Sequence, residues 1–313
     1  MSNNTIHEGI IWRSTGSWYS VRTSEGKLLQ CRLKGKFKIK GLKVTNPLAV
    51  GDFVKYKIED TADSNGIITD ILPRENYIIR KSVHKTGHGH LLACNLDQAI
   101  LVVTLTFPKT SLGFIDRFLV SSESFRIPTV LVFNKSDLLE EETEAYQNEL
   151  MALYESLGYQ CLSVSALKGS NIDQIKELIH GKTSLFSGHS GVGKSKLINQ
   201  LIPELDLQTS EVSKFANKGV HTTTFAEMYE AEPETFIIDS PGIKELGLME
   251  MENEEIGHYF PEIRELMSEC KFHNCLHVNE PKCAVKQAVV DGGIAESRFD
   301  SYLSMLENID NRR

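Results

Sequence analysis

The chain lacks any apolar run that approaches the ~20 residues needed to cross a bilayer. Nothing in it resembles a secretory signal peptide. We therefore expect a cytoplasmic protein that is not associated with a membrane. Internal repeats and low-complexity tracts are also missing, and the composition is that of a soluble globular protein. At 313 residues, the chain has room for two or three domains.

Cysteine is scarce, with six residues in the chain, and half of these residues are clustered. The clustered cysteines and one histidine have the spacing C-x4-C-x-H-x5-C; they are Cys270, Cys275, His277 and Cys283. In a reducing compartment, such a cluster favours metal binding over disulfides. Cys₃His is the donor set of a structural zinc site, and four protein ligands leave no open position. We therefore expect one structural zinc ion per chain, with His273 as an alternative ligand.

Charge is unevenly distributed along the chain. The net charge of −8 argues against a nucleic-acid-binding protein if the chain is taken as a whole. Residues 1–58, however, carry 11 Lys and Arg against 3 Asp and Glu, whereas the remainder carries 23 against 39. A basic module is therefore joined to an acidic one. The alternating lysines of the basic module could contact phosphate or form a solvated face; they are Lys34, Lys36, Lys38 and Lys40.

The basic module has the pattern of a small β-barrel. Turn residues separate five strand-like segments, at 9–12, 18–22, 28–33, 53–58 and 67–72. Five strands in this length suit an OB-type barrel. Trp12, Trp18 and Tyr19 could stack on bases or belong to the core. We expect an RNA-binding OB-fold domain over residues 1–72.

Residues 188–195 fit the G-x-x-x-x-G-K-[ST] pattern of a phosphate-binding loop. A strand-like segment precedes the loop and a helical segment follows it, which would place phosphates at a helix N-terminus. Lys194 is expected to reach the β- and γ-phosphates, and Ser195 to bind Mg²⁺. The loop alone does not separate ATP from GTP. The residues expected to line it are Ser187, Gly188, His189, Ser190, Gly191, Val192, Gly193, Lys194 and Ser195.

Two other segments predict a guanine site. The apolar run 128–133 is typical of a buried parallel strand, and it ends in Asn134-Lys135-Ser136-Asp137. Ligands bind beyond the carboxyl ends of such strands. There, the Asp137 carboxylate can accept hydrogen bonds from N1–H and the 2-amino group of guanine, and Lys135 can pack over the base. A second strand, 160–164, leads to Ser165 and Ala166, where a backbone N–H can meet guanine O6.

A magnesium-binding carboxylate is expected at Asp239, which follows the strand-like segment 235–238. Asp239 would hold Mg²⁺ through water, and the Gly242 N–H would contact the γ-phosphate. A threonine should complete the Mg²⁺ shell. Thr223 is favoured, and Thr222 and Thr224 stay open.

Ile243 follows Gly242, at the point where many GTPases carry a glutamine that orients water. An apolar side chain cannot do this, so intrinsic hydrolysis should be slow. His221 is the nearest polar candidate in the sequence for the missing group, although it could equally be a surface histidine.

Helical patterns at 111–125, 140–157 and 171–180 alternate with the strands and predict a doubly wound, mostly parallel α/β sheet. Residues 73–76 look like the exit from the barrel, and residues 84–90 like an exposed glycine-rich loop. After residue 248 the chain becomes acidic and helical around the cysteine cluster. The expected domains are 1–72, 73–248 and 249–313.

The motif order is unusual, because the guanine-reading segments precede the phosphate-reading ones. An ordinary GTPase runs the other way, so the order predicts a circularly permuted P-loop GTPase. With the basic barrel and the C-terminal cysteine spacing, essentially the whole chain resembles the circularly permuted GTPases of the RsgA (YjeQ) type. Two positions depart from the family pattern. Val220 stands where an arginine is usual, and Ser240 where threonine is commoner.

The resemblance implies a GTPase that binds the small (30S) ribosomal subunit and its rRNA and hydrolyses GTP during late maturation, stimulated by the ribosome. It implies GTP or GDP, Mg²⁺ and Zn²⁺ as ligands. It also implies that His221 aids hydrolysis, with Thr223 and Lys194 in the catalytic site. We expect a monomer. The alternatives are an RNA-binding protein with a structural nucleotide, a large-subunit GTPase, and a P-loop kinase, which would have no use for Asp137.

Overall fold

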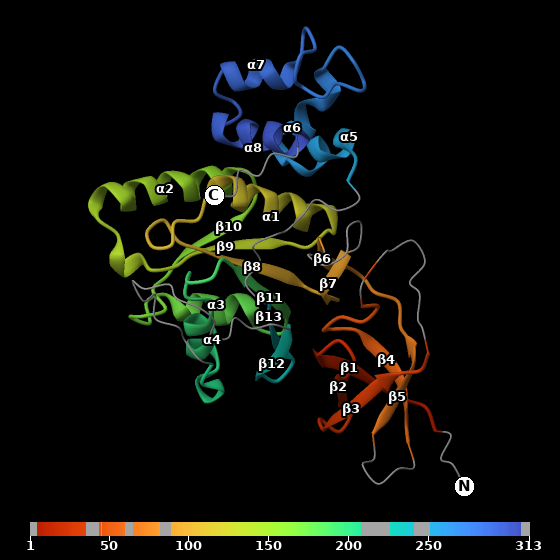
Figure 1. Ribbon diagram of the computed structural model, residues 1–313. Coiled ribbons are helices and arrows are strands. Elements are labelled where there is room, and N and C mark those ends of the chain that lie inside the picture. The colour runs from red at the N-terminus through yellow and green to blue at the C-terminus, as the bar shows by residue number, and fades with distance from the viewer. Residues whose placement is uncertain are drawn as a thin grey trace, which may run out of the picture.

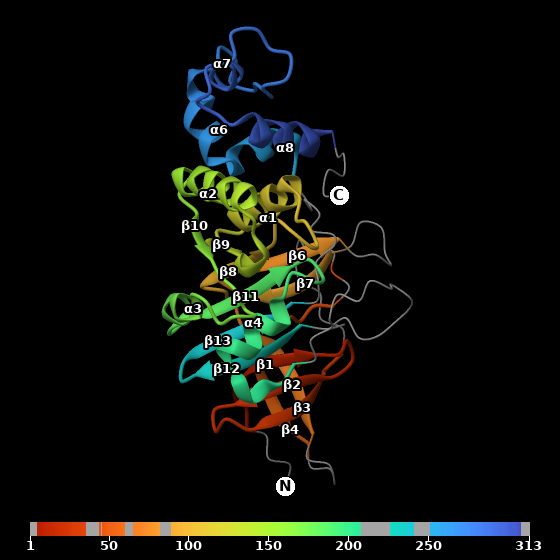
Figure 2. The same ribbon diagram turned by 90° about the vertical axis from the view of Figure 1, so that its left-hand side faces the viewer.

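The computed structural model describes residues 5–35, 44, 46–59, 65–81, 89–207, 226–240 and 251–307. An α/β unit lies between an N-terminal β-barrel and a C-terminal helical unit (Figures 1 and 2). Within these described ranges, no helix is both long enough and apolar enough to span a membrane.

The barrel is closed and contains five strands. They are β1 (His7–Ser14), β2 (Tyr19–Thr23), β3 (Leu28–Leu33), β4 (Phe53–Ile58) and β5 (Gly66–Ile71). Their order is β1-β2-β3-β5-β4, and β4 also pairs with β1, which removes the open edge. Alternate side chains such as Ile11, Val21, Val54 and Ile68 fill the core. Each strand overlaps a segment expected from the sequence, so the OB-type barrel is confirmed.

Only one of the three aromatic residues considered for base stacking is exposed. Trp18 is 41% exposed. Tyr19 is buried in the barrel core and its hydroxyl donates a 2.6 Å hydrogen bond to Asn46. Trp12 lies at the barrel's junction with the α/β unit, edge-on to Phe236 and beneath the Arg22 guanidinium. Of the two alternatives, Tyr19 belongs to the core, and Trp12 is partly buried by packing at the junction.

The barrel and the α/β unit share one continuous sheet. Strand β1 pairs antiparallel with β12 (Glu227–Glu232), with Arg13 opposite Glu227. The Arg13 Nε lies 3.6 Å from a carboxylate oxygen of Glu227, and Arg22 donates a 2.5 Å hydrogen bond to Glu230. The barrel thus covers the edge strand of the neighbouring sheet.

A two-stranded hairpin follows the barrel, made of β6 (Tyr77–Lys81) and β7 (Gly89–Cys94). The sequence was expected to form an exposed loop over 84–90, but Gly89 and His90 belong to strand β7. Residues 84–88 of that expected loop lie outside the described residues. Glycine and histidine are weak strand formers, which is why local pattern missed the pairing.

The α/β unit has a six-stranded sheet in the order β10-β9-β8-β11-β13-β12. Strands β8 to β11 and β13 run parallel, and β12 is antiparallel to β13. The parallel strands are β8 (Gln98–Val103), β9 (Thr129–Phe133), β10 (Gln160–Ser163), β11 (Thr183–Gly188) and β13 (Thr235–Asp239). The expected mostly parallel doubly wound sheet is confirmed.

Helices cover both faces of this sheet (Figure 1). Apolar residues of α1 (Leu112–Ser124) and α2 (Glu141–Ser156) pack on one face. Those of α3 (Ile172–Ile179) and α4 (Lys194–Leu201) pack on the other. The short 3₁₀ helices are η1 (Ser136–Leu138) and η2 (Pro203–Leu205). Ser111 caps α1, since its hydroxyl accepts a hydrogen bond from the Phe114 N–H.

The C-terminal unit is helical and packs on the α1 side of the sheet (Figure 2). Its elements are α5 (Asn253–Ile256), η3 (Gly257–Tyr259), α6 (Pro261–Leu266), η4 (Met267–Glu269), α7 (Ala284–Val290) and α8 (Glu296–Leu306). Val120 of α1 lies in the same apolar core as Phe260, Ile263 and Tyr302. The expected boundary after residue 72 follows the end of β5, and the one after residue 248 lies outside the described residues.

Candidate functional site

The loop 189–193 connects strand β11 to helix α4, which begins at Lys194. Gly193 has a φ of +92°, a region that favours glycine, and a Cβ there would lie 2.4 Å from Asn134 Nδ2. A Cβ on Gly188 would lie 2.5 Å from the Val102 carbonyl oxygen. Close packing therefore requires both glycines. Ser195 is the second residue of α4, so the loop leads into a helix N-terminus, where anions bind readily.

Lys194 and Asp239 meet at the carboxyl edge of the sheet. The Lys194 Nζ contacts the Asp239 carboxylate and donates a 2.8 Å hydrogen bond to the Ser240 carbonyl. Burial raises the pKa of Asp239, and the charge of Lys194 opposes that rise. The Ser240 hydroxyl donates a 2.9 Å hydrogen bond to the Phe186 carbonyl. The cation and carboxylate that phosphates and Mg²⁺ need are thus adjacent.

The Asn134 side chain joins three loops. Its amide group donates a 2.8 Å hydrogen bond to the Val192 carbonyl of the 188–195 loop. Its amide oxygen accepts a 2.9 Å hydrogen bond from the Ala166 N–H. The segments 134–137, 165–166 and 188–195, which are far apart in the chain, therefore surround one point at the sheet edge.

Asp137 and Ser165 also meet. The Ser165 hydroxyl donates a short hydrogen bond to the Asp137 carboxylate, and it accepts a 3.0 Å hydrogen bond from the Lys168 N–H. This second bond fixes the hydroxyl so that it points at the carboxylate. Ser165 orients Asp137, a relation that sequence spacing did not reveal.

Lys135 sits beside a segment that the sequence did not single out. Its φ of +69° is in the left-handed region, and its Nζ donates a 2.5 Å hydrogen bond to the Phe107 carbonyl. Burial lowers the pKa of Lys135, and nearby Asp137 opposes that shift. The lysine stem is therefore held along the edge of the site.

Two further contacts of the loop were unexpected. The His189 ring lies against the Phe114 ring of α1, with centroids 3.7 Å apart and planes tilted by 33°. Ser187 is fully buried and its hydroxyl has no hydrogen-bond partner within the described part of the chain. An aromatic residue three positions after the cap of α1 was the only sequence signal for the Phe114 contact.

Three of the expected site residues lie outside the described part of the chain. His221, Thr223 and Gly242, with Ile243, lie outside the described residues, as do the competing Thr222 and Thr224. The expected roles of these residues stay predictions.

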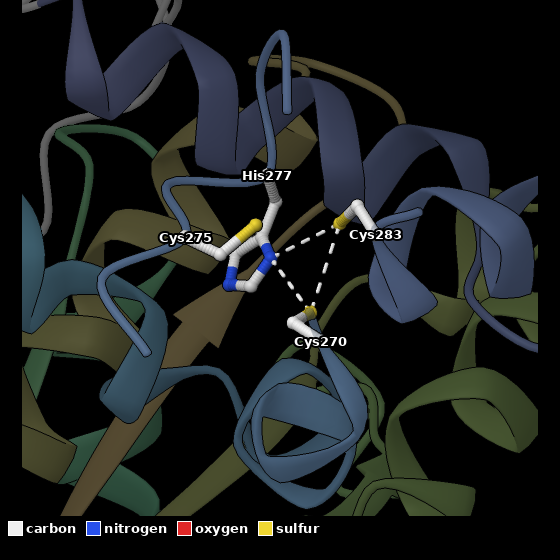
Figure 3. A group of neighbouring side chains, drawn as sticks. All are labelled: Cys270, Cys275, His277 and Cys283. Carbon is white, nitrogen blue, oxygen red and sulfur yellow. Dashed lines mark hydrogen bonds between the residues drawn. The ribbon is translucent and has the colours of Figure 1, made fainter. Parts of the chain in front are cut away.

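The cysteine cluster forms in the C-terminal unit. The side chains of Cys270, Cys275, His277 and Cys283 converge on one point, and their ligand atoms all lie within 4.8 Å of one another (Figure 3). Cys270 follows η4 and Cys283 precedes α7, while Cys275 and His277 come from the loop between them. His273 is exposed and is not part of the group, so it is not the alternative ligand.

Three of the four ligand atoms are spaced as in a tetrahedral zinc site. Zinc ligands at 2.0–2.3 Å from the metal are about 3.3–3.8 Å from each other. His277 Nδ1 lies 3.6 Å from Cys270 Sγ and 3.3 Å from Cys283 Sγ, and the two sulfurs are 3.8 Å apart. Burial raises the pKa of Cys275 to about 12 and lowers that of His277. A bound metal would therefore have to displace the thiol protons, and burial favours the neutral imidazole that can bind a metal.

Glu280 orders the loop that carries two of these ligands. Its carboxylate accepts hydrogen bonds of 2.8–3.0 Å from the N–H groups of Leu276, Val278 and Asn279. The Tyr302 hydroxyl of α8 donates a 2.9 Å bond to the Leu276 carbonyl. The loop is therefore held from two sides, which supports the ligand directions.

Comparison with known proteins identifies the family. A family model described as RsgA GTPase matches residues 71–249, and one described as RsgA N-terminal domain matches residues 8–68. The chain belongs to the RsgA GTPase family. A relative from Cytophaga hutchinsonii, named small ribosomal subunit biogenesis GTPase RsgA, is 54% identical over 306 residues, which cover 98% of this chain and 100% of the relative. As an RsgA GTPase, the protein is a GTP hydrolase.

Solved structures of similar proteins agree with the RsgA fold. YjeQ from Thermotoga maritima is 36% identical and matches with a TM-score of 0.76, covering 99% of this chain and 100% of that one. YloQ, described as a circularly permuted GTPase, is 31% identical with a TM-score of 0.71, covering 99% and 97%. The permuted connectivity expected from motif order is confirmed.

Replacing Asp137 by Asn should relax the preference of this RsgA protein for guanine, because an amide cannot accept both guanine donors. Losing hydrogen bonds to a charged group should weaken GDP binding by roughly 1.5–3 kcal/mol. Titrations of GDP and XDP binding measure the effect, with the exposed Asp173→Asn as the matched control. Unchanged GDP affinity with no gain for XDP would remove Asp137 from the guanine site.

Replacing Cys275 by Ser should lower the zinc content and increase proteolysis of the C-terminal unit, because structural metal binding is coupled to local folding. GDP should still bind, since none of the four clustered residues lies at the sheet edge. Metal analysis and limited proteolysis test this. Cys161→Ala, in the core of the α/β unit, is the control that should keep its zinc. A wild-type protein without zinc and with freely reactive thiols would contradict the assignment.

Proposed function

We propose that this RsgA-family GTPase acts on the small (30S) ribosomal subunit during its late maturation, and that the subunit stimulates its GTP hydrolysis. The proposed GTP site is supported by the hydrogen bonds of the Asn134 side chain, which hold the guanine-reading and phosphate-reading segments together at one sheet edge. The subunit part is supported by the name of the Cytophaga relative and by the basic character of residues 1–58.

The guanine base would be read by Asp137, with Lys135 along one face of it. Ser136, Ser165 and Ala166 would complete the base site, where Ala166 offers a backbone N–H to guanine O6. This assignment is supported by the Ser165 hydrogen bond that orients Asp137. A carboxylate held in this way discriminates guanine from adenine, which has no matching pair of donors.

The phosphates would be held by the backbone of 188–193 and by Lys194. Bound Mg²⁺ would neutralise phosphate charge, with Ser195 and Thr223 as direct ligands and Asp239 acting through water. The pairing of Lys194 with Asp239 supports these roles, because it puts the phosphate-binding cation next to the carboxylate that would hold Mg²⁺. The Gly242 N–H would contact the γ-phosphate.

Hydrolysis would depend on His221, because Ile243 offers water no hydrogen bond. Lys194 would stabilise charge on the transferring phosphoryl group. In the free protein, the water would be poorly oriented and turnover slow. Docking on the subunit would bring His221 into position.

The barrel would supply the rRNA contact. Lys34 is exposed at the end of β3, beside Arg32, and Trp18 is exposed in the turn between β1 and β2. Cations on this surface would pair with phosphates, and Trp18 could stack on an unpaired base. Lys36, Lys38 and Lys40 belong to the same basic stretch and lie outside the described residues.

Zinc would be structural, because the four clustered ligands fill a tetrahedral site and leave no position for substrate. We also propose a cytoplasmic monomer with domains at 1–72, 73–248 and 249–313.

Small subunits should raise the rate of GTP hydrolysis, and His221→Ala should lose most of that increase while keeping its GTP affinity. Phosphate release is measured with and without 30S particles, and with 50S particles to test the large-subunit alternative. The exposed His180→Ala is the matched control. Equal stimulation in the His221 variant and the wild type would remove His221 from the mechanism. A protein that shows no turnover with either particle would be a binding protein only.

Replacing Lys34, Lys36, Lys38 and Lys40 by alanine should weaken 30S binding and flatten its salt dependence. The logarithmic slope should fall by roughly 0.7–0.9 for each phosphate that is no longer neutralised. Sedimentation with 30S particles over a range of salt concentrations measures the slope. Lys176→Ala, on α3 away from the barrel, is the control. If the slope does not change, these lysines form a solvated face.

A further inference from the structure

Helix α1 belongs to two cores at once. Phe114, Phe118 and Leu119 pack in the core of the α/β unit, whereas Val120 is fully buried in the core of the C-terminal unit. Both views show α1 between the sheet and helix α8 (Figures 1 and 2). Any displacement of the C-terminal unit relative to the sheet must therefore act on α1.

A buried charge network fixes α1 to the C-terminal unit. Arg298 of α8 is 1% exposed and donates a 2.6 Å hydrogen bond to Asp116 of α1. The other side of the same guanidinium donates bonds of 2.7 and 3.2 Å to Glu262 of α6. The Tyr154 hydroxyl of α2 donates a 2.9 Å bond to the same Asp116 oxygen. Removing one partner from such a desolvated group leaves a charge unpaired, so the network resists separation.

The first turns of the same helix touch the proposed phosphate loop. Phe114, two residues before Asp116, packs its ring against His189, with the ring centroids 3.7 Å apart. His189 directly follows Gly188, where the close approach to Val102 already restricts the backbone. Hence one helical segment carries both the interdomain charge contact and the contact to the loop.

Two residues as close together in one helix as Phe114 and Asp116 move as a rigid body. Residues 114 and 116 are separated by about 3 Å along the axis, so a shift of Asp116 is passed to Phe114 almost undiminished. Misplacement of a positioned group by about 1 Å can have a large effect at a functional site. A ring packed on His189 is therefore placed to set the conformation of residues 189–193.

We propose that Arg298 and Asp116 are positioning residues for the phosphate loop, acting through Phe114 and His189. Docking of the C-terminal unit on α1 then tightens the hold of the loop on nucleotide. Because coupling between two binding events is reciprocal, nucleotide also strengthens the docking of the C-terminal unit. The inference rests on the proposed role of residues 188–195 in phosphate binding and does not depend on the ribosome.

The test is a double-mutant cycle on the full-length, zinc-loaded protein. Asp116→Asn keeps the shape of the side chain and removes its charge, and Phe114→Leu keeps apolar volume and removes the ring. The dissociation rate of a fluorescent GDP analogue is measured by stopped flow. Each single variant should raise the rate by about 2- to 30-fold, the range typical of coupling through packed networks. The double variant should be no faster than the faster single variant. Multiplied effects would mean independent action and overturn the proposal.

Control variants separate positioning from general loosening. Tyr302→Phe removes a hydrogen bond inside the C-terminal unit, to Leu276, without touching the charge network, and should leave the GDP dissociation rate unchanged. Arg298→Lys keeps the charge but lacks the planar fork that bonds Glu262 through two nitrogens and Asp116 through the third. It should behave like Asp116→Asn. A Tyr302→Phe variant that releases GDP as fast as Asp116→Asn would overturn the proposal.

A second readout reports on the loop itself. The His189 ring protons lie in the shielding field of Phe114, and their NMR signals can be assigned with His189→Asn. Asp116→Asn should shift these signals toward those of Phe114→Leu, and unchanged signals in the folded variant would overturn the proposal. Lys194→Ala distinguishes the phosphate site from the positioning role. If Lys194→Ala retains full GDP affinity, the phosphate-site assignment fails. If Lys194→Ala loses GDP affinity but Asp116→Asn releases GDP at the wild-type rate, only the positioning role is overturned.

Discussion

The Asn134 side chain is the contact on which the proposed nucleotide site depends. A single buried amide bonds to the Val192 carbonyl and the Ala166 N–H, and so fixes three loops that leave three different strands. It also explains why residue 193 must be glycine, since a Cβ there would displace the amide. The site is therefore defined by neighbouring strands of a parallel sheet. The order in which the chain visits those strands is irrelevant to it, and permutation leaves the site intact.

Permutation does change what is attached to the sheet, and where. The antiparallel edge strand β12 is covered by strand β1 of the barrel, and the helical unit packs on the outer side of α1. Among the described residues, strand β13, which ends in Asp239, is the last strand of the sheet before the C-terminal unit. The carboxylate proposed for Mg²⁺ is thus close in sequence to one attached unit, and two strands away from the other.

Features fixed by short spacing could be predicted from the sequence. The cysteine cluster, the 188–195 loop and the buried parallel strands each depend on residues within about one supersecondary unit. The hairpin β6–β7 was missed, because glycine and histidine conceal the strand pattern of Gly89–Cys94. The alternatives for Trp12 stayed open, because only the tertiary fold shows its edge-on contact with Phe236. The pairing of Asp116 with Arg298 joins residues 182 positions apart, and no local pattern signals such a contact.

The ion pairs that join the barrel to the α/β unit differ in burial from those that join the helical unit to it. At the barrel, the Arg13–Glu227 and Arg22–Glu230 pairs are partly exposed, and such pairs contribute about 0–1 kcal/mol each. At the helical unit, Arg298 is enclosed with its carboxylates, where no solvent competes for the bonds and misalignment leaves a charge unpaired. Salt screens the first kind of contact far more than the second. The ion pairs at the barrel, which add to the β1–β12 strand pairing, are therefore more sensitive to salt than the Arg298 network. That network joins the helical unit to the helix that touches the phosphate loop.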